Sequence, residues 1–337
     1  MYGVMSRGRN RLMLAAAALV AAFVAALAAS NAQSQAATAN KVIAFNVGAA
    51  SDPFFVAMEV SADAEAKKLG YTVDWQGAPT EYSPATQIPI VDTQFAQKPA
   101  ALIIAPTDPN ALQAPVNQFI KAGIPVVNVD THVTKLGSVL SFITGNNANG
   151  GQNAAKALAK AMHYTKGKTY QVAVGLTSAT TTTNVARLAG FKQEIKQHYP
   201  GIKIVAVGYS QSQPTKADAN VSNWLSSFPH LSGIFAIDGT NASGASAAIE
   251  AHNLVGKVAL VGYDAYATNV ALLKKGVFSA LIAQNPTQEA KLAVDDVVKY
   301  LKHHSKGGIK HLVTLPNIVL TPKTSAAALT KYTYPAP

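Results

Sequence analysis

The sequence contains no cysteine among its 337 residues. This absence excludes disulfide bonds, thiol catalysis, a zinc site with cysteine ligands and a lipid anchor attached to a cysteine. Aromatic residues make up only 7% of the chain and charged residues only 13%. The chain is long enough to form two ordinary domains, so we expect an apolar core without covalent cross-links.

Acidic residues are fewer than basic ones, 17 against 28, which gives a net charge of +11. A positive balance of this size can indicate a surface that binds nucleic acid or membranes. Three of the basic residues are Arg7, Arg9 and Arg11, near the start of the chain, and the lysines are scattered along the rest. We therefore interpret the lysines as solvated helix faces and expect no nucleic-acid partner.

Long apolar runs are absent except for one, residues 12–29. The three arginines precede this run and small polar residues follow it, which is typical of a secretory signal peptide. Ser34-Gln35-Ala36 offers small residues for cleavage, and Ser30-Asn31-Ala32 is a second candidate; an uncleaved membrane anchor is the rival interpretation. We predict a cleaved signal peptide over residues 1–36 and a periplasmic location.

After residue 40, short apolar segments alternate with amphipathic ones. Residues 42–47 predict a strand, and a helix follows that Asp52 can cap, with Pro53 at its first position and Gly70 beyond its end. Further strands are expected at 71–75, 100–105 and 125–130, with helices at 85–97 and 111–122. Strands that alternate with helices in this way indicate a parallel sheet covered on both faces.

The same order of elements returns in the second half of the chain. Strands are expected at 171–176, 203–207, 233–237 and 258–263, with helices at 184–197, 218–226 and 242–252. Residues 123–130 match residues 256–264, since both segments are strands that end in an aspartate, and the offset between the halves is nearly constant. We predict an α/β fold with two similar Rossmann-like, doubly wound parallel-sheet domains.

Two similar open sheets in one chain bring two sets of strand ends near one another. Ligands of open parallel sheets bind outside the carboxyl ends of the strands, so the expected site is a cleft between the two domains.

Two groups of residues are candidates for binding a ligand there. Asp52, Phe54 and Phe55 follow the first strand, and aromatic rings suit the C–H faces of a sugar while carboxylates suit its hydroxyls. The alternative is that Asp52 only caps the helix and that the phenylalanines belong to the core.

The second group follows later strands and one loop. It comprises three aspartates that end strands, an arginine that follows the Thr-rich loop 177–183, and a glutamine after a late apolar strand: Asp130, Asp238, Asp264, Arg187 and Gln284. Helix capping is the alternative for the aspartates, and a surface salt bridge is the alternative for the arginine. Gln284 could line the cleft or satisfy a hinge carbonyl.

Motifs in a fixed order along the chain carry a family resemblance. They are Asp-Pro-Phe-Phe at 52–55, Ile-Ala-Pro-Thr-Asp at 104–108, Gly-Ile-Pro-Val at 123–126, Gly-Asn-Asn at 145–147, Val-Gly-Tyr-Asp at 261–264 and Ile-Ala-Gln-Asn-Pro at 282–286. The chain resembles the ribose-binding-protein branch of the type I periplasmic binding proteins, the substrate-binding components of ABC sugar importers.

The resemblance implies roles for individual residues. It implies that Phe54 and Phe55 stack on a sugar and that four polar residues bind its hydroxyls: Asp130, Arg187, Asp264 and Gln284. It also implies that Asn147, in a loop near the hinge, contacts the ligand, and puts Asp52 and Asp238 where the family often has asparagine.

The resemblance further implies the domain bounds. We expect a first lobe of residues 41–144 plus 285–313, a second lobe of residues 145–284 plus 314–325, and a tail of residues 326–337. Three crossings near Thr144, Asn285 and residues 314–316 would then form a hinge.

Two positions depart from the pattern of the ribose binders. Ala105 stands where they carry an amide side chain, and Thr131 stands where they carry an arginine. Because both donors are lost, the resemblance leaves open a different pentose, a hexose, a sugar alcohol or a furanose-like signal.

The implied function is capture of a monosaccharide or polyol, followed by hinge closure and delivery to an ABC permease in the inner membrane. We expect a monomer without a cofactor or a metal and without enzymatic activity.

One alternative is a sensor for a furanose-like signal that contacts a chemoreceptor or sensor kinase, and a remote one is a sugar-modifying enzyme. A cluster at His303, His304 and His311 is interpreted as a solvated helix end. A transcription regulator would need a DNA-binding motif where the signal peptide lies.

Overall fold

The computed structural model describes residues 40–335 with the exception of residue 80. The predicted signal peptide and its two candidate cleavage sites lie outside the described residues. Within the described part of the chain, none of the helices is both long and apolar enough to cross a membrane.

The first sheet has six strands in the order β11-β5-β4-β3-β1-β2, and every pairing is parallel. Its strands are β1 (Val42–Val47), β2 (Thr72–Gly77), β3 (Ala101–Ile104), β4 (Val126–Val129), β5 (Ser141–Gly145) and β11 (Leu312–Leu315). The strands β3, β4 and β5 are buried along their whole length, as expected of parallel strands that have helices on both faces.

The second sheet also has six strands, in the order β12-β10-β9-β8-β6-β7. They are β6 (Tyr170–Leu176), β7 (Ile202–Tyr209), β8 (Leu231–Ala236), β9 (Ala259–Tyr263), β10 (Ala280–Ala283) and β12 (Ile318–Leu320). Only the short β12 runs antiparallel to its neighbour, β10. The predicted fold class, two similar α/β domains with doubly wound sheets, is confirmed.

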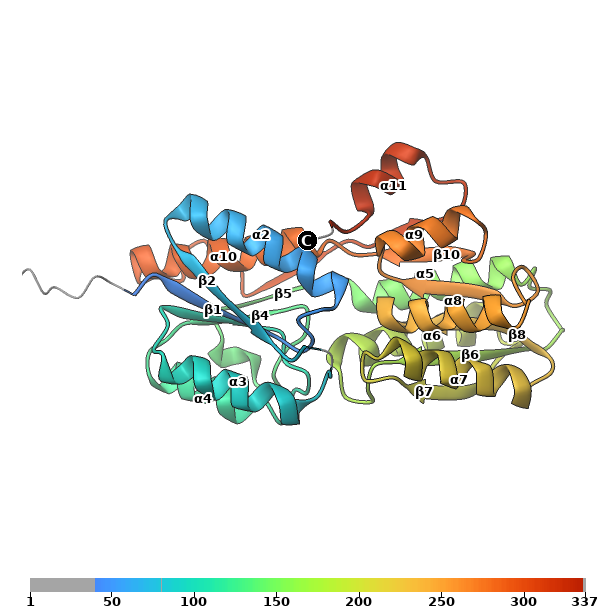
Figure 1. The fold of residues 1–337 in the computed structure, drawn as a ribbon, viewed down its shortest axis with the longest axis horizontal. Coiled ribbons are helices and arrows are strands. Elements are labelled where there is room, and N and C mark those ends of the chain that lie inside the picture. Colours follow the sequence, from blue (N-terminus) through green and yellow to red (C-terminus); the bar gives the residue numbers. More distant parts are fainter. Residues whose placement is uncertain (1–39, 80, 336–337) are drawn as a thin grey trace, which may run out of the picture. The chain divides into compact units, whose positions relative to one another are not determined.

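Helices cover both faces of the first sheet (Figure 1). The pair α2 (Pro53–Leu69) and α10 (Pro286–His303) packs on one face, and α3 (Pro84–Ala96) and α4 (Gln113–Lys121) pack on the other. A single 3-10 turn, η1 (Leu136–Ser138), joins β4 to β5. We call this sheet and its helices the first lobe.

The second sheet is covered in the same way. The pair α5 (Asn147–Ala161) and α6 (Thr182–His198) packs together on this sheet, and α7 (Pro214–Ser227) packs with α8 (Gly239–Ala251). Two shorter helices are α9 (Ala267–Lys274) and α11 (Ala326–Tyr332). We call this sheet and its helices the second lobe.

Two glycines allow α5 and α6 to pack closely. A Cβ atom at Gly151 would lie 1.9 Å from the main-chain oxygen of Arg187, and one at Gly190 would lie 2.0 Å from that of Ala148. No other residue fits at such distances, so these glycines fix α6, and the side chains that it carries, against α5.

The first helix begins and ends where its sequence predicts. Asp52 is the N-cap of α2 and accepts a hydrogen bond from the Phe54 amide at 2.9 Å, and Pro53 occupies the first turn. Gly70 ends the helix with φ 82°, in the left-handed region that glycine adopts without strain.

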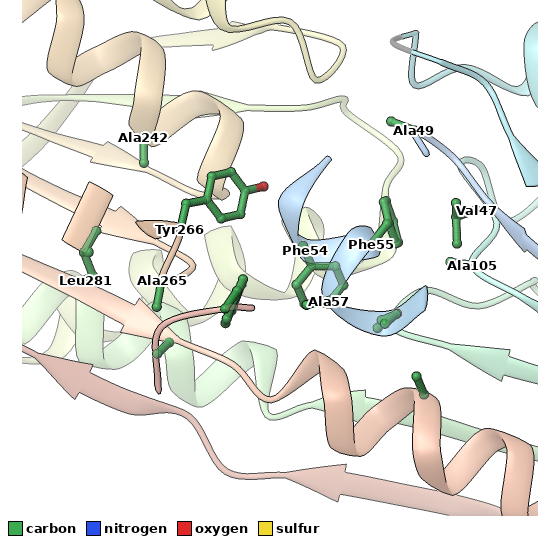
Figure 2. Close-up of a cluster of buried hydrophobic side chains, with 14 of the residues drawn as sticks. Val47, Ala49, Phe54, Phe55, Ala57, Ala105, Ala242, Ala265, Tyr266 and Leu281 are labelled. Atoms are coloured by element: carbon green, nitrogen blue, oxygen red, sulfur yellow. The ribbon is translucent and has the colours of Figure 1, made fainter. Parts of the chain in front are cut away.

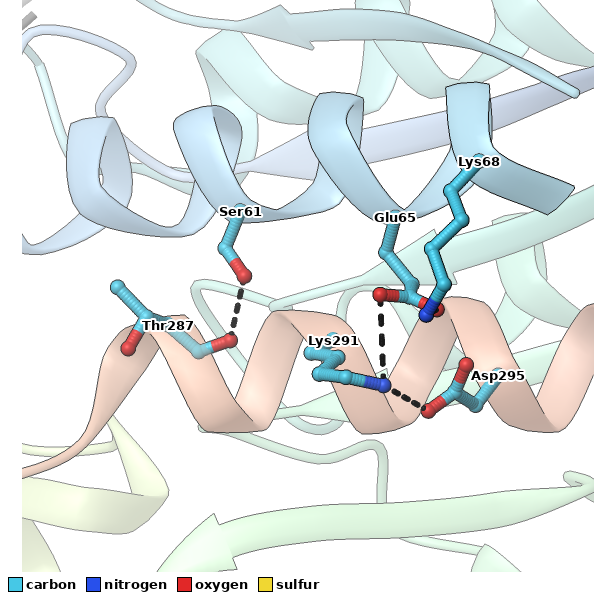
Figure 3. Close-up of polar contacts among 6 residues, drawn as sticks. All are labelled: Ser61, Glu65, Lys68, Thr287, Lys291 and Asp295. Carbon is cyan, nitrogen blue, oxygen red and sulfur yellow. Dashed lines mark hydrogen bonds and ion pairs between the residues drawn. The ribbon is translucent and has the colours of Figure 1, made fainter.

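Polar contacts hold α2 and α10 side by side (Figure 3). The hydroxyl of Ser61 donates to the main-chain oxygen of Thr287 at 2.7 Å. The ammonium of Lys291 lies 3.4 Å from Glu65 and 2.7 Å from Asp295. Because α10 directly follows β10, these contacts fix the place where the chain leaves the second sheet for the first.

The chain passes between the two sheets three times. The passages lie between β5 and α5, between β10 and α10, and between β11 and β12. The exact residues at which the lobes begin and end remain predictions.

Apolar side chains from both lobes form one continuous buried cluster (Figure 2). It contains Phe54 and Phe55 from α2, and also Tyr266, Ala265 and Leu281 from the second lobe. The residues that follow the strands of one sheet are thereby in contact with those that follow the strands of the other.

Candidate functional site

A pocket that is partly open to solvent lies at the carboxyl ends of strands from both sheets. This is where open parallel sheets bind ligands. Eight of the nine residues that the sequence singles out line it: Asp52, Phe54, Phe55, Asp130, Arg187, Asp238, Asp264 and Gln284.

The ninth residue, Asn147, does not line this pocket and instead holds Arg187. Its side-chain oxygen accepts a hydrogen bond from the Arg187 Nε at 2.8 Å. Its Nδ2 donates to the Thr144 hydroxyl and to the Gly145 main-chain oxygen, each at 3.0 Å. Asn147 therefore joins the arginine to the end of β5.

Arg187 is buried, with an exposed fraction of 2%, so the interpretation as a surface salt bridge is wrong. Its Nη1 donates to the main-chain oxygen of Ile237 at 3.0 Å. The guanidinium also lies over the Tyr263 ring, 3.8 Å from its centre. These contacts leave further N–H groups of the guanidinium for a ligand, since it has five in all.

Asp264 accepts hydrogen bonds on both carboxylate oxygens. Its Oδ2 accepts from the Gly239 amide at 2.8 Å, and its Oδ1 accepts from Gln284 Nε2 at 2.7 Å and from the Tyr334 hydroxyl at 2.9 Å. Burial raises the pKa of the carboxyl, while Arg187 and these donors oppose the rise. Gln284 thus lines the pocket and also orients Asp264.

Asp238 has the helix-capping role that was its alternative. It is the N-cap of α8, where its Oδ1 accepts from the Asn241 amide at 2.8 Å. Its Oδ2 accepts from the Thr177 hydroxyl at 2.7 Å. The same carboxylate lines the pocket, so capping does not remove it from the site.

Asp52 joins the two lobes as well as capping α2. Its Oδ2 accepts from the Thr240 hydroxyl at 3.1 Å, and its Oδ1 accepts from the Tyr266 hydroxyl. Burial raises the pKa of Asp52 to about 6, and the hydrogen bonds from Tyr266 and Phe54 limit the rise.

Asp130 differs from the other three aspartates because its Oδ1 is buried without a hydrogen-bond partner among the described residues. Its exposed fraction is 6%, and its main chain has φ 59°, in the left-handed region. Burial raises its pKa, with Arg187 opposing the rise. A buried oxygen without a partner carries a free-energy cost that a hydroxyl donor can relieve.

Phe54 and Phe55 belong to the buried core and also lie at the pocket. Their rings meet edge to face with centres 5.4 Å apart, and both are buried in the cluster of Figure 2. Both also line the pocket. They therefore supply the apolar part of a wall whose other parts are polar.

Seven lining residues were not anticipated from the sequence: Tyr82, Thr177, Thr181, Thr183, Asn184, Ser212 and Tyr266. Three of them belong to the Thr-rich loop 177–183, which nothing in the sequence distinguishes from any solvated loop. Only their place along the chain could have indicated them, because most of them directly follow a strand or open a helix in the second lobe.

The pocket thus combines four carboxyl groups, one guanidinium, several hydroxyls and aromatic rings. Such a set can accept and donate many hydrogen bonds while covering an apolar face of a small molecule. Among residues 40–79 and 81–335 no three histidine or carboxylate side chains are placed so that they could hold a metal ion, and His304 ends α10.

Two open sheets that carry such a pocket at their strand ends define a two-lobed binding protein for small molecules. Residues 43–305 match the model of the periplasmic binding protein domain, and the chain belongs to this family. The resemblance to type I periplasmic sugar-binding proteins is thereby confirmed.

Curated relatives agree over most of the chain. The ribose import binding protein RbsB of Salmonella typhimurium is 30% identical over 285 residues, which cover 84% of this chain and 92% of the relative. The D-apiose import binding protein of Paraburkholderia graminis is 30% identical over 293 residues, covering 87% and 91%. These relatives are binding proteins, which agrees with the expectation that the chain is not an enzyme.

Solved structures give the same result. An ABC transporter solute-binding protein of Agrobacterium vitis, bound with α-D-tagatopyranose, superposes with a TM-score of 0.81 at 29% identity. A carbohydrate transporter solute-binding protein of Agrobacterium radiobacter, in complex with D-arabinose, superposes with a TM-score of 0.82 at 27% identity. Each match covers 88% of this chain and 99% of the other.

Proposed function

We propose that the chain is the periplasmic substrate-binding component of an ABC sugar importer, and that it binds a monosaccharide or a related polyol in the pocket. The observation that carries this function is that eight residues, singled out as sugar ligands from sequence alone, line one pocket. The ligands bound by the relatives, which include ribose, D-apiose, D-tagatose and D-arabinose, support the same class of substrate.

The pocket suits a sugar in two ways. Phe54 and Phe55 supply apolar surface for the C–H face of a ring. Asp130 offers an unpartnered acceptor and Arg187 offers donors, so hydrogen bonds to hydroxyls there are charge-assisted. A misplaced hydroxyl leaves a buried group unsatisfied at a cost of about 1–3 kcal/mol, which allows the pocket to distinguish epimers.

The ligand proposed is not ribose itself. Ala105 and Thr131 are fully buried beside the pocket residues, and they stand where ribose binders carry an amide and a guanidinium. Alanine has no polar side-chain atom, and the Thr131 hydroxyl donates one hydrogen bond where a guanidinium offers five N–H groups. A pentose other than ribose, a hexose or a sugar alcohol is the expected class.

Delivery of the sugar to the permease would depend on the three passages of the chain between the lobes. These passages can act as a hinge that closes on the ligand, as two-domain binding proteins do, and the closed form would dock on a permease in the inner membrane. We place the protein in the periplasm after removal of residues 1–36. We propose that it acts as a monomer.

A thermal-shift screen of the mature protein against pentoses, hexoses and sugar alcohols tests this function. At a concentration of one hundred times Kd, a ligand adds about 2.7 kcal/mol to the free energy of unfolding, so Tm rises by several degrees. The Asp264→Asn variant should lose most of the shift, and its ligand-free Tm should also fall, because the amide nitrogen replaces an oxygen that accepts a hydrogen bond. Asp92→Ala, at an exposed position on α3, is the matched control. No shift with any compound would contradict the function.

A further inference from the structure

The C-terminal segment, residues 326–335, packs on the lobes through two buried side chains. Its helix α11 begins after Ser325, whose hydroxyl accepts from the Ala328 amide at 3.3 Å. With only seven residues, α11 has little stability of its own and depends on tertiary contacts. Those contacts come from Leu329 and Tyr334, which have exposed fractions of 3% and 5%.

Tyr334 is hydrogen-bonded at both its main chain and its hydroxyl. Its amide donates to the main-chain oxygen of Ala265 at 2.9 Å. Its hydroxyl donates to Oδ1 of Asp264 at 2.9 Å and accepts from the amide of Gln284 at 3.1 Å. One hydroxyl therefore joins the pocket carboxylate after β9 to the residue that follows β10.

The ring of Tyr334 contacts an aromatic residue of each lobe. Its centre lies 6.0 Å from that of Phe54, which lines the pocket from α2. It also lies 6.0 Å from that of Tyr266, whose hydroxyl donates to Asp52. Tyr334 is thus placed behind the pocket, between side chains that come from different lobes.

Simple core filling does not account for this arrangement. A phenylalanine would fill the same volume and would avoid burying a polar group. The hydroxyl of Tyr334 has both a donor and an acceptor partner inside the protein, and both partners belong to residues that line the pocket. The hydroxyl is therefore the part of the residue that needs a functional explanation.

We propose that Tyr334 is a positioning residue of the ligand site. Through Tyr334, the C-terminal segment contributes to ligand affinity. The hydroxyl holds the Asp264 carboxylate in the orientation that faces the pocket and ties it to the main chain at Gln284, where the chain leaves the second lobe. This role rests on the proposed function of the pocket.

Coupling between the segment and the pocket must be reciprocal. If docking of Tyr334 strengthens binding, then bound sugar must strengthen docking of Tyr334. The amide of Tyr334, which donates to Ala265, should therefore exchange its hydrogen more slowly when the pocket is filled. A residue with a purely structural role would show no such dependence on ligand.

The first measurement compares Tyr334→Phe with Tyr332→Phe, a matched change two residues earlier on α11. Calorimetry would use D-ribose, D-arabinose, D-tagatose, D-fucose and D-allose as probes. The sugar that binds wild type should bind Tyr334→Phe about tenfold more weakly, while Tyr332→Phe should bind as wild type does. The ligand-free Tm of Tyr334→Phe should fall by a few degrees, because the main-chain amide of Gln284 loses its acceptor. Equal affinities in all three proteins would overturn the proposal, and so would unchanged amide exchange on adding sugar.

A second measurement needs no ligand, and so separates this inference from the proposed function. Burial raises the pKa of Asp264, and the Tyr334 hydroxyl is one of the donors that oppose the rise. The other charged or titratable groups around Asp264 come from both lobes. They are Arg187 of α6, Asp238 at the start of α8, Asp52 at the start of α2, Asp130 after β4, Tyr263 at the end of β9, Tyr266 before α9 and Glu289 of α10.

In carboxyl NMR titrations of ligand-free protein, the midpoint of Asp264 should be higher in Tyr334→Phe than in wild type, because one donor to the carboxylate is lost. An unchanged midpoint would overturn the inference. If no compound of the thermal-shift panel binds wild type, the proposed function fails, and this titration still decides whether Tyr334 positions Asp264.

Discussion

The guanidinium carbon of Arg187, a residue that lines the pocket, lies over the ring of Tyr263, 3.8 Å from its centre. Arg187 is the only arginine in the sequence after residue 11, and all other basic side chains after that residue are lysines or histidines. A guanidinium at this place can stack on a ring and donate along its edges, which an ammonium group cannot do.

Arg187→Lys should therefore weaken sugar binding by roughly tenfold to a hundredfold, because a hydrogen bond to a charged group contributes about 1.5–3 kcal/mol. Calorimetric titration with the sugar found in the screen measures this loss. Lys192→Ala, an exposed change on the same helix, is the control and should leave affinity unchanged. Wild-type affinity in Arg187→Lys would show that the arginine only supports the fold.

Asp130→Asn should weaken sugar binding without destabilising the protein. Asparagine tolerates the φ of 59° at this position, and it removes a buried carboxylate whose Oδ1 has no partner among the described residues. Asp130→Ala should lose about 1–2 kcal/mol of stability as well, because alanine is strained in the left-handed region. Urea unfolding and calorimetry separate the two effects, and full affinity in Asp130→Asn would remove this residue from the site.

Glu289→Gln should stabilise the protein, and more so at higher pH. Glu289 lies on α10 and is fully buried, and burial together with the charge of Asp130 raises its pKa well above the ordinary value. Because the folded state then holds a proton that the unfolded state releases, stability falls as pH rises above the unfolded pKa. The difference in Tm between the variant and wild type should therefore grow from pH 5 to pH 8.

Glu250→Gln, at an exposed position on α8, serves as the control for the pH series and should give a nearly constant difference in Tm. If Glu289→Gln also gave a constant difference, the buried carboxyl would not be protonated in the folded protein.

Gly151→Ala should destabilise the protein by about 1–3 kcal/mol or more, because its Cβ would lie 1.9 Å from the main-chain oxygen of Arg187. Displacement of α6 should weaken sugar binding in the same variant. Gly137→Ala is the matched control, since no atom lies within 4 Å of the Cβ it would add. Equal stability of the two variants in urea would mean that α5 and α6 can move apart at little cost.

Much of the fold could be predicted from the sequence, because its signals are local. Asp52, Pro53 and Gly70 lie at the ends of one helix and mark both of them. The short apolar runs that predict strands are also local signals. The predicted strand 203–207, for example, differs from the observed β7, Ile202–Tyr209, only at its ends.

The site was less predictable where contacts join distant parts of the chain. Asn147 was expected to meet the ligand, but it holds Arg187, 40 residues further along. Tyr334 meets Asp264 across 70 residues of sequence, and no pattern near either residue indicates the contact. The hydroxyls of Thr181 and Thr183 became recognisable only when their loop was placed beside the pocket.

The central claim, that the pocket between the two sheets binds a sugar, is tested most directly by a crystal structure of the protein grown with the sugar that gives the largest thermal shift. The account predicts one sugar molecule per chain, with a C–H face against Phe54 or Phe55 and hydroxyls bonded to Asp130 and Arg187. A sugar bound elsewhere, with the Asp130 carboxylate and the Arg187 guanidinium contacting only protein, would contradict it.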